Sequence, residues 1–107
     1  MTPWLPCRVL ILEPQGLLRD LLAQAIAQNP QFELAGTFGD AEEAMQGGAA
    51  LSPRLIVMDV HFPDGRGLEA ASFFLTHLPF SRVLVLSESV DAKMTDGIDG
   101  NPRSRMR

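Results

Sequence analysis

The chain has 107 residues, of which 46% are apolar and 21% are charged, and its net charge is −4. This length supports one ordinary domain, and the apolar share is too high for a disordered chain. No apolar run approaches the roughly 18 residues that cross a bilayer, so we expect no membrane-spanning segment. The single cysteine, Cys7, has no intramolecular disulfide partner, which fits a cytoplasmic protein.

The charges are distributed unevenly along the chain. Residues 1–100 hold all 13 acidic residues but only 6 of the 9 basic ones, because Arg103, Arg105 and Arg107 lie in the last five positions. A body this acidic repels a phosphate backbone. We therefore expect no direct binding of nucleic acid by this chain.

Short apolar segments alternate with amphipathic ones. Residues 8–12 form a branched apolar run typical of a buried strand, and residues 17–27 carry a helical apolar stripe that ends before Pro30. The stripe consists of Leu17, Leu18, Leu21, Leu22, Ala25 and Ile26. Residues 32–36 alternate like a strand at a sheet edge, and Asp40 is suited to cap a short helix that ends at Gly47 and Gly48.

The second half of the chain repeats this alternation. Residues 55–58 predict a second buried strand, residues 63–67 a turn, and residues 82–86 a fourth strand. Between the turn and the last strand, a helical stripe is predicted at Leu68, Ala71, Ser72, Leu75 and Leu78. Strands and helices that alternate at this interval predict right-handed βαβ units, and so an α/β fold with a parallel sheet.

The character of the chain changes after Ser89. We expect residues 7–89 to form the domain, and residues 90–107 to form a short helical turn followed by a disordered or non-native tail. No fifth strand is recognisable in this last stretch. The fourth strand would then be an apolar edge, which invites pairing with another chain, so we expect a homodimer or else aggregation.

Three polar residues end three of the predicted strands: Glu13, Asp59 and Ser87. The carboxyl ends of parallel strands lie at one edge of a sheet, so these side chains are expected to converge there. Two neighbouring carboxylates repel each other, and Mg²⁺ with oxygen ligands relieves that repulsion. A carboxylate beside Mg²⁺ is a plausible nucleophile toward a phosphoryl group.

Residues 55–69 contain an apolar strand, Asp59, Pro63 four residues later, and Gly-Leu-Glu at the start of a helix. This segment resembles the phosphoacceptor segment of the receiver domains of bacterial two-component response regulators. The likeness extends from about residue 8 to residue 87 and is greatest for regulators with a C-terminal helix-turn-helix, and we expect the chain to be truncated before such an output. It implies a flavodoxin-like α/β/α fold in which the fifth strand and last helix are not recognisable.

The resemblance also implies roles for individual residues. Asp59 matches the aspartate that accepts phosphate from a histidine kinase, and Ser87 matches the switch hydroxyl. Mg²⁺ would be held by Glu13, Asp59 and the backbone carbonyl of His61, whose imidazole is expected to be exposed. We assign no chemistry to His77.

The sequence departs from the family at two functional positions. Glu13-Pro14 stands where the family has two consecutive acids, so we expect weak Mg²⁺ binding, and the lysine that ends the fifth strand has no counterpart. A pseudo-receiver that is not phosphorylated and serves only in protein interactions therefore stays an alternative. A third possibility, a small hydrolase or phosphatase, lacks a general base near Asp59, a glycine-rich phosphate loop and a catalytic cysteine, so we do not expect an enzyme.

Overall fold

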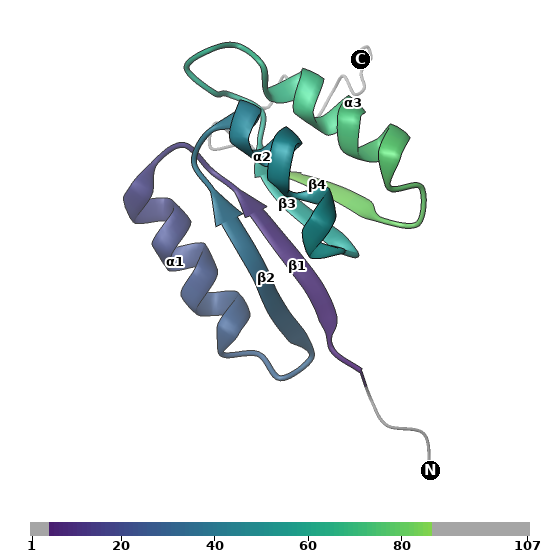
Figure 1. Cartoon of the computed structure of the whole chain (residues 1–107). Coiled ribbons are helices and arrows are strands. Elements are labelled where there is room, and N and C mark those ends of the chain that lie inside the picture. The colour runs from purple at the N-terminus through teal and green to yellow at the C-terminus, as the bar shows by residue number, and fades with distance from the viewer. Residues whose placement is uncertain (1–4, 87–107) are drawn as a thin grey trace, which may run out of the picture.

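The computed structural model describes residues 5–86 as a four-stranded parallel sheet in the order β2-β1-β3-β4, with helices on both faces (Figure 1). Ser87 and the expected tail at residues 90–107 lie outside the described residues. The elements in chain order are β1 (Cys7–Leu12), α1 (Gly16–Ala27), β2 (Phe32–Phe38), α2 (Ala41–Gly47), the short 3₁₀ helix η1 (Ala49–Leu51), β3 (Leu55–Asp59), α3 (Gly67–His77) and β4 (Arg82–Leu86).

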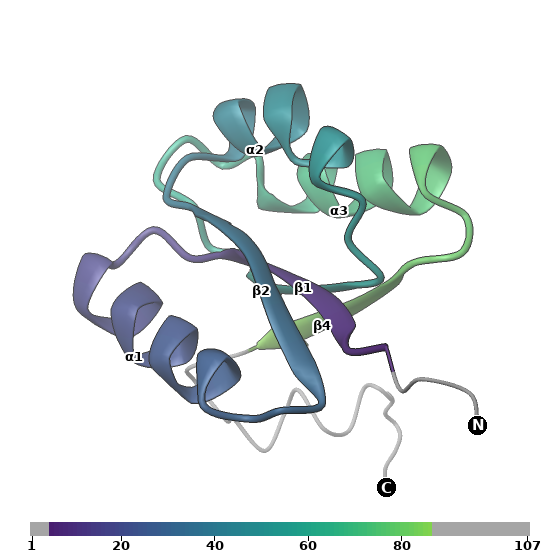
Figure 2. The same ribbon diagram turned by 60° about the horizontal axis from the view of Figure 1, so that its bottom comes forward.

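The helices divide between the two faces of the sheet. Figure 2 shows α1 on one side and α2 with α3 on the other. Because side chains alternate along a strand, each central strand contributes to two cores. Leu10, Leu12 and Met58 pack beneath α2 and α3, whereas Val9, Ile11 and Val57 face α1. The three-layer α/β/α fold with a parallel sheet is therefore confirmed for the described part of the chain.

Both predicted helical stripes need correction. In α1, Leu17 is 77% exposed and Leu21 54% exposed, while Leu22 and Ile26 pack against the sheet. In α3, Leu68 and Leu75 are exposed, and the buried residues are Gly67, Ala70, Ala71 and Phe74. The apolar stripe on each helix is wider than the strip that touches the sheet, so tertiary packing decides which side of it is buried.

The boundaries of the short elements follow from local chemistry. Asp40 caps α2 as predicted, because its side chain accepts a hydrogen bond from the backbone N–H of Glu43 at 2.9 Å. β2 extends two residues beyond its predicted end, to Phe38, and lies at the sheet edge as predicted. Within residues 5–86, no helix is both long and apolar enough to span a membrane.

Candidate functional site

The two predicted site carboxylates follow neighbouring strands at the same edge of the sheet. Leu12 in β1 pairs in register with Met58 in β3, so Glu13 and Asp59 occupy the next positions on two adjacent strands. Asp59 itself pairs with Leu86, the last residue of β4. The topology therefore brings both acids to the carboxyl edge, although they lie 46 positions apart in the sequence.

Asp59 is only 5% exposed, and one of its oxygens is fixed by the backbone. Its Oδ1 accepts a hydrogen bond from the backbone N–H of His61 at 2.8 Å, which holds the carboxylate across the turn that follows β3. Among the described residues, no hydrogen-bond donor is assigned to its Oδ2. The carboxylate is thus held in place through one oxygen.

Glu13 is buried to 1% exposure beside this position. Its backbone N–H donates to the carbonyl of Phe38 at 3.0 Å, which anchors it to the end of β2. Its Oε2 accepts from the backbone N–H of Gln15 at 3.1 Å. The proline at position 14 thus lies inside a tight turn that the Glu13 side chain closes.

Two buried carboxylates at adjacent strand ends suit a hard cation with oxygen ligands, such as Mg²⁺. Residues 5–86 contain no group of three or more His, Cys, Asp or Glu side chains that could hold a metal ion. A cation between Glu13 and Asp59 would therefore need main-chain or water oxygens to complete its coordination. The donor set fits Mg²⁺, which usually keeps several of its waters.

Arg19 is a residue of this edge to which we assigned no role from the sequence. Its Nη1 donates to the carbonyl oxygen of Glu13 at 2.8 Å, and so ties the first turns of α1 to the end of β1. The guanidinium lies over Gly39, where an added Cβ would overlap it. The Arg19–Gly39 contact needs a residue without a side chain in the β2–α2 loop, and only the tertiary structure shows the pairing.

The loop between β3 and α3 shapes the other side of the site. Phe62 is buried to 6% exposure, and Gly65 adopts a positive φ of 75°, a conformation that favours glycine. At Gly67 an added Cβ would overlap the carbonyl oxygen of Val60. The backbone therefore doubles back closely after Asp59, and two glycines permit this path.

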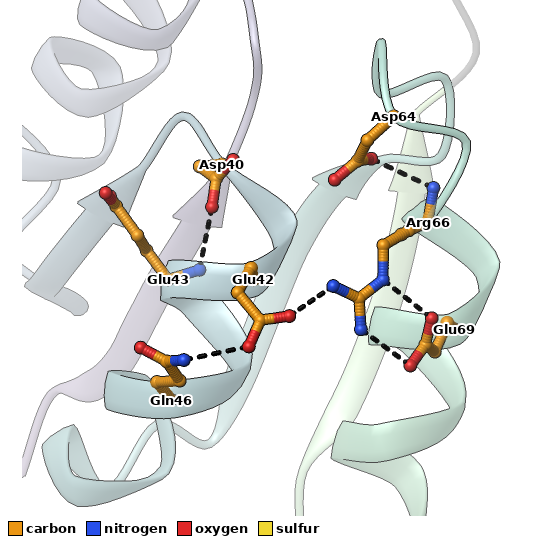
Figure 3. A network of polar contacts seen from close by, with 7 residues as sticks. All are labelled: Asp40, Glu42, Glu43, Gln46, Asp64, Arg66 and Glu69. Carbon is orange, nitrogen blue, oxygen red and sulfur yellow. Dashed lines mark hydrogen bonds and ion pairs between the residues drawn. The ribbon is translucent and has the colours of Figure 1, made fainter.

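Arg66 connects this loop to both helices on that face (Figure 3). It forms an ion pair with Glu42 of α2, and its Nη2 lies 2.8 Å from a carboxylate oxygen of Glu69 in α3. Its backbone N–H donates to Oδ1 of Asp64 at 3.0 Å. The guanidinium, by hydrogen bonding and charge, lowers the pKa of Glu69 below its usual value of 4.5.

The remaining predicted residues are placed as follows. The side chain of His61 is exposed, as expected. His77 lies at the end of α3, where its ring stacks on Phe73 at a centroid distance of 4.1 Å, away from the carboxyl edge. Ser87 lies outside the described residues, so the structure brings together Glu13, Asp59 and the backbone of His61 only.

Comparisons with known proteins place this arrangement in a family, although no family model matches the chain. The protein-glutamate methylesterase/protein-glutamine glutaminase 2 of Anaeromyxobacter dehalogenans is 35% identical over 82 residues, which are 77% of this chain and 24% of that protein. The DNA-binding transcriptional activator DevR/DosR of Mycobacterium tuberculosis is 32% identical over 92 residues, which are 85% of this chain and 42% of that protein. The solved response regulator domain of Thermotoga maritima CheB matches with a TM-score of 0.71 and 27% identity, covering 87% of this chain and 71% of that one. The chain belongs to the response-regulator receiver family.

Membership of this family confirms the resemblance inferred from residues 55–69. As a receiver domain, the chain is of the kind that serves two-component signal transduction. It spans between 24% and 42% of the length of the two curated relatives described above. The activities in the relatives' names are therefore activities of longer proteins.

Proposed function

We propose that this receiver domain accepts a phosphoryl group on Asp59 from a histidine kinase. The main support is the position of Asp59, which ends a central strand beside a second buried carboxylate and is held by one oxygen on the backbone of His61. The domain that we propose covers residues 7–89. It would signal by changing its protein contacts and would not act as an enzyme on a separate substrate.

The proposed chemistry uses the oxygen of Asp59 that the backbone of His61 does not hold. Oδ2 attacks the phosphorus of a phosphohistidine, the phosphorus–nitrogen bond breaks, and the departing imidazole takes up a proton from water. The product is an acyl phosphate on Asp59. The hydrogen bond from His61 keeps Oδ1 in place throughout, so the attacking oxygen is presented in one orientation.

Mg²⁺ at this site would be held by Glu13, Asp59 and the backbone carbonyl of His61. When bound, it would neutralise charge on the transferring phosphoryl oxygens. Glu13 is the only acid at the end of β1, and its side chain already accepts a hydrogen bond from the backbone N–H of Gln15. We therefore propose that Mg²⁺ binds weakly. Ser87 is proposed as the switch hydroxyl that donates to the attached phosphoryl group.

Incubation with acetyl phosphate and Mg²⁺, followed by intact mass spectrometry, tests this proposal. We expect a gain of one phosphoryl group that is lost in Asp59→Asn and in the absence of Mg²⁺. Asp64→Asn is the matched control, because Asp64 is an exposed aspartate of the same loop and should leave the gain unchanged. Phosphorylation that survives in Asp59→Asn would contradict the assignment.

A pseudo-receiver is the second candidate, and one contact favours it. The carboxylate of Glu13 closes a turn onto the backbone of Gln15, and this hydrogen bond competes with metal coordination. In that case the domain acts as a protein-interaction module without phosphorylation. An unchanged mass after exposure to acetyl phosphate, and after incubation with kinases of the same genome, would support this candidate over the first.

We also propose that the receiver domain forms a homodimer through the edge of β4, in the cytoplasm. In the described part of the chain, β4 pairs only with β3. Leu84 and Val85 point to opposite faces of the sheet and are 50% and 47% exposed. An apolar edge of this kind favours strand addition by a second copy.

A further inference from the structure

The amino edge of the sheet holds a pocket that the proposed phosphorylation does not use. Its volume is about 660 Å³, within the range of small-molecule sites. It lies where β1, β3 and β4 begin, at the opposite end of the strands from Glu13 and Asp59. The residues on which the argument rests are Leu5, Arg8, Arg54, Leu55, Phe80 and Arg82.

Strand register brings three arginines together at this pocket. The backbone N–H of Arg54 donates to the carbonyl of Arg8 at 2.8 Å, and that of Arg82 donates to the carbonyl of Arg54 at 3.0 Å. The three residues therefore stand side by side across the start of the sheet. The other two basic residues within residues 5–86 are Arg19 and Arg66, so most of the positive charge of this acidic domain gathers here.

The three guanidinium groups are not equivalent. The guanidinium of Arg8 already has partners within the domain. It forms an ion pair with Glu33 at 2.9 Å, and its Nε and Nη2 donate to the carbonyl of Leu51. Arg54 and Arg82 are exposed and form no ion pair within residues 5–86. Two cations that form no ion pair within residues 5–86 therefore line one pocket, and a guanidinium binds carboxylate or phosphate through paired hydrogen bonds.

Apolar side chains form the rest of the wall. Phe80 is 85% exposed in the loop that leads into β4, and Leu5 is 81% exposed before β1. Leu55, the first residue of β3, is half-buried. In the sheet, β3 lies between β1, which follows Leu5, and β4, which follows Phe80. An exposed aromatic ring beside two arginines offers both a stacking surface and a charged anchor.

We infer that this pocket binds a small organic anion whose carboxylate or phosphate lies against Arg54 and Arg82 and whose apolar body lies against Leu55 and Phe80. Nucleic acid is a poorer fit, because the net negative charge of residues 1–100 repels a polyanion. A small anion is affected mainly by charges within the Debye length, which is about 8 Å at physiological ionic strength. The size of the pocket also suits a compact ligand.

The test uses 1-naphthyl phosphate as the probe, with 1-naphthol and inorganic phosphate as its two halves, in buffer without Mg²⁺. We expect saturable binding of 1-naphthyl phosphate by isothermal titration calorimetry, and affinities at least about tenfold weaker for each half. Two-dimensional amide NMR should show shifts at Arg54, Leu55 and Phe80. Shifts confined to residues 59–63 would place the probe at the carboxyl edge and overturn the inference.

Variants distinguish binding of the probe in the pocket from its non-specific attraction to positive surface charge. Arg54→Gln and Arg82→Gln should each weaken binding by about tenfold, and Phe80→Ala by several-fold, with the fold checked by circular dichroism. Two control variants should leave binding unchanged. Arg66→Gln removes a positive charge from the loop that follows β3, at the carboxyl edge of the sheet, and Leu75→Ala removes an exposed leucine from α3. Equal losses in Arg54→Gln and Arg66→Gln would mean non-specific attraction and would overturn the inference. Binding only of a polyglutamate peptide, with none of the naphthyl probe, would do the same and would indicate a protein partner.

Discussion

Asp59 owes its position to the backbone that follows it rather than to neighbouring side chains. The His61 N–H holds one carboxylate oxygen, and the loop then turns sharply enough to bring Gly67 against Val60. A glycine at position 67 is needed because any side chain would overlap the carbonyl of Val60. The geometry of the phosphoacceptor therefore depends on a residue eight positions away that carries no chemistry.

Gly67→Ala should destabilise the domain, because the carbonyl of Val60 cannot move without disturbing the end of β3. Overpacking of this kind costs about 1–3 kcal/mol, and backbone contact places the expected loss in the upper half of that range. Urea denaturation followed by circular dichroism measures it. Gly16→Ala is the matched control, since an added Cβ there meets only the end of the flexible Arg19 side chain at 3.6 Å, and its stability should stay near that of the wild type.

Glu69→Gln should lower stability at neutral pH and have no effect in acid. The ion pair with Arg66 lowers the pKa of Glu69 in the folded state, so its contribution is present above the ordinary value of 4.5. That contribution disappears as the pH falls through the lowered pKa. We expect the urea midpoints of wild type and variant to differ slightly at pH 7 and to converge as the pH falls through the lowered pKa of Glu69.

At the scale of the elements, α3 packs on the core of the domain through only a few of its residues. Phe74 is fully buried against the sheet and meets Phe73 edge to face, whereas the adjacent Leu75 is 55% exposed. The ring of Phe74 also lies where a side chain at position 48 would have to go. The helix is therefore attached through one aromatic anchor and a row of small residues.

Phe74→Ala should cost about 3–5 kcal/mol, because it removes a fully buried ring and leaves a cavity between α3 and β3. Leu75→Ala is the matched comparison on the same turn of the helix, and its cost should stay below about 1 kcal/mol. Chemical denaturation of both variants measures the difference. Similar losses in the two variants would show that the buried face of α3 has been assigned incorrectly.

The elements could be predicted from the sequence because their local signals are strong. Branched runs such as residues 55–58, the cap at Asp40 and the breaks before Pro30 and at Gly47 each act within a few residues. The buried faces of α1 and α3 could not be predicted in the same way. Their apolar stripes are broad, and the strip that is buried depends on how each helix lies on the twisted sheet.

The candidate site was partly predictable for a related reason. Glu13 and Asp59 follow apolar strands, and parallel topology alone brings such residues to one edge. The role of Arg19 was not predictable, because its contact with the carbonyl of Glu13 and with Gly39 joins three separate segments. The hydrogen bond from Gln15 to Glu13, which bears on metal binding, likewise becomes visible only when the turn is formed.

At the scale of the whole molecule, exposed apolar residues lie on both sides of the sheet. In the described part of the chain, α1 lies on one face of the sheet, and its Leu17 and Leu21 are exposed together with Leu84 of β4. The other face is covered by α2 and α3. The described domain therefore exposes apolar side chains on both sides, with Leu68 and Leu75 on α3, and along the β4 edge.

The proposed dimer predicts that Val85→Lys shifts the chain toward monomer, because a charge on an edge strand opposes strand addition. Size-exclusion chromatography with light scattering, over a range of concentrations, gives the mass of each species. Leu75→Lys places the same charge on the exposed face of α3 and should leave the dimer intact. A wild-type chain that is monomeric at every concentration would contradict the dimer.

The sequence by itself determined the order of strands and helices, the parallel sheet and the edge where two acids meet. It did so because strand runs, turn residues and caps act locally, and because parallel topology orders the strand ends. Only the tertiary structure decided which helix faces are buried, how Glu13 is turned toward Gln15, and that Arg8, Arg54 and Arg82 stand together at the amino edge. These features join residues that are distant in the sequence, and their energies depend on packing and register that no single segment contains.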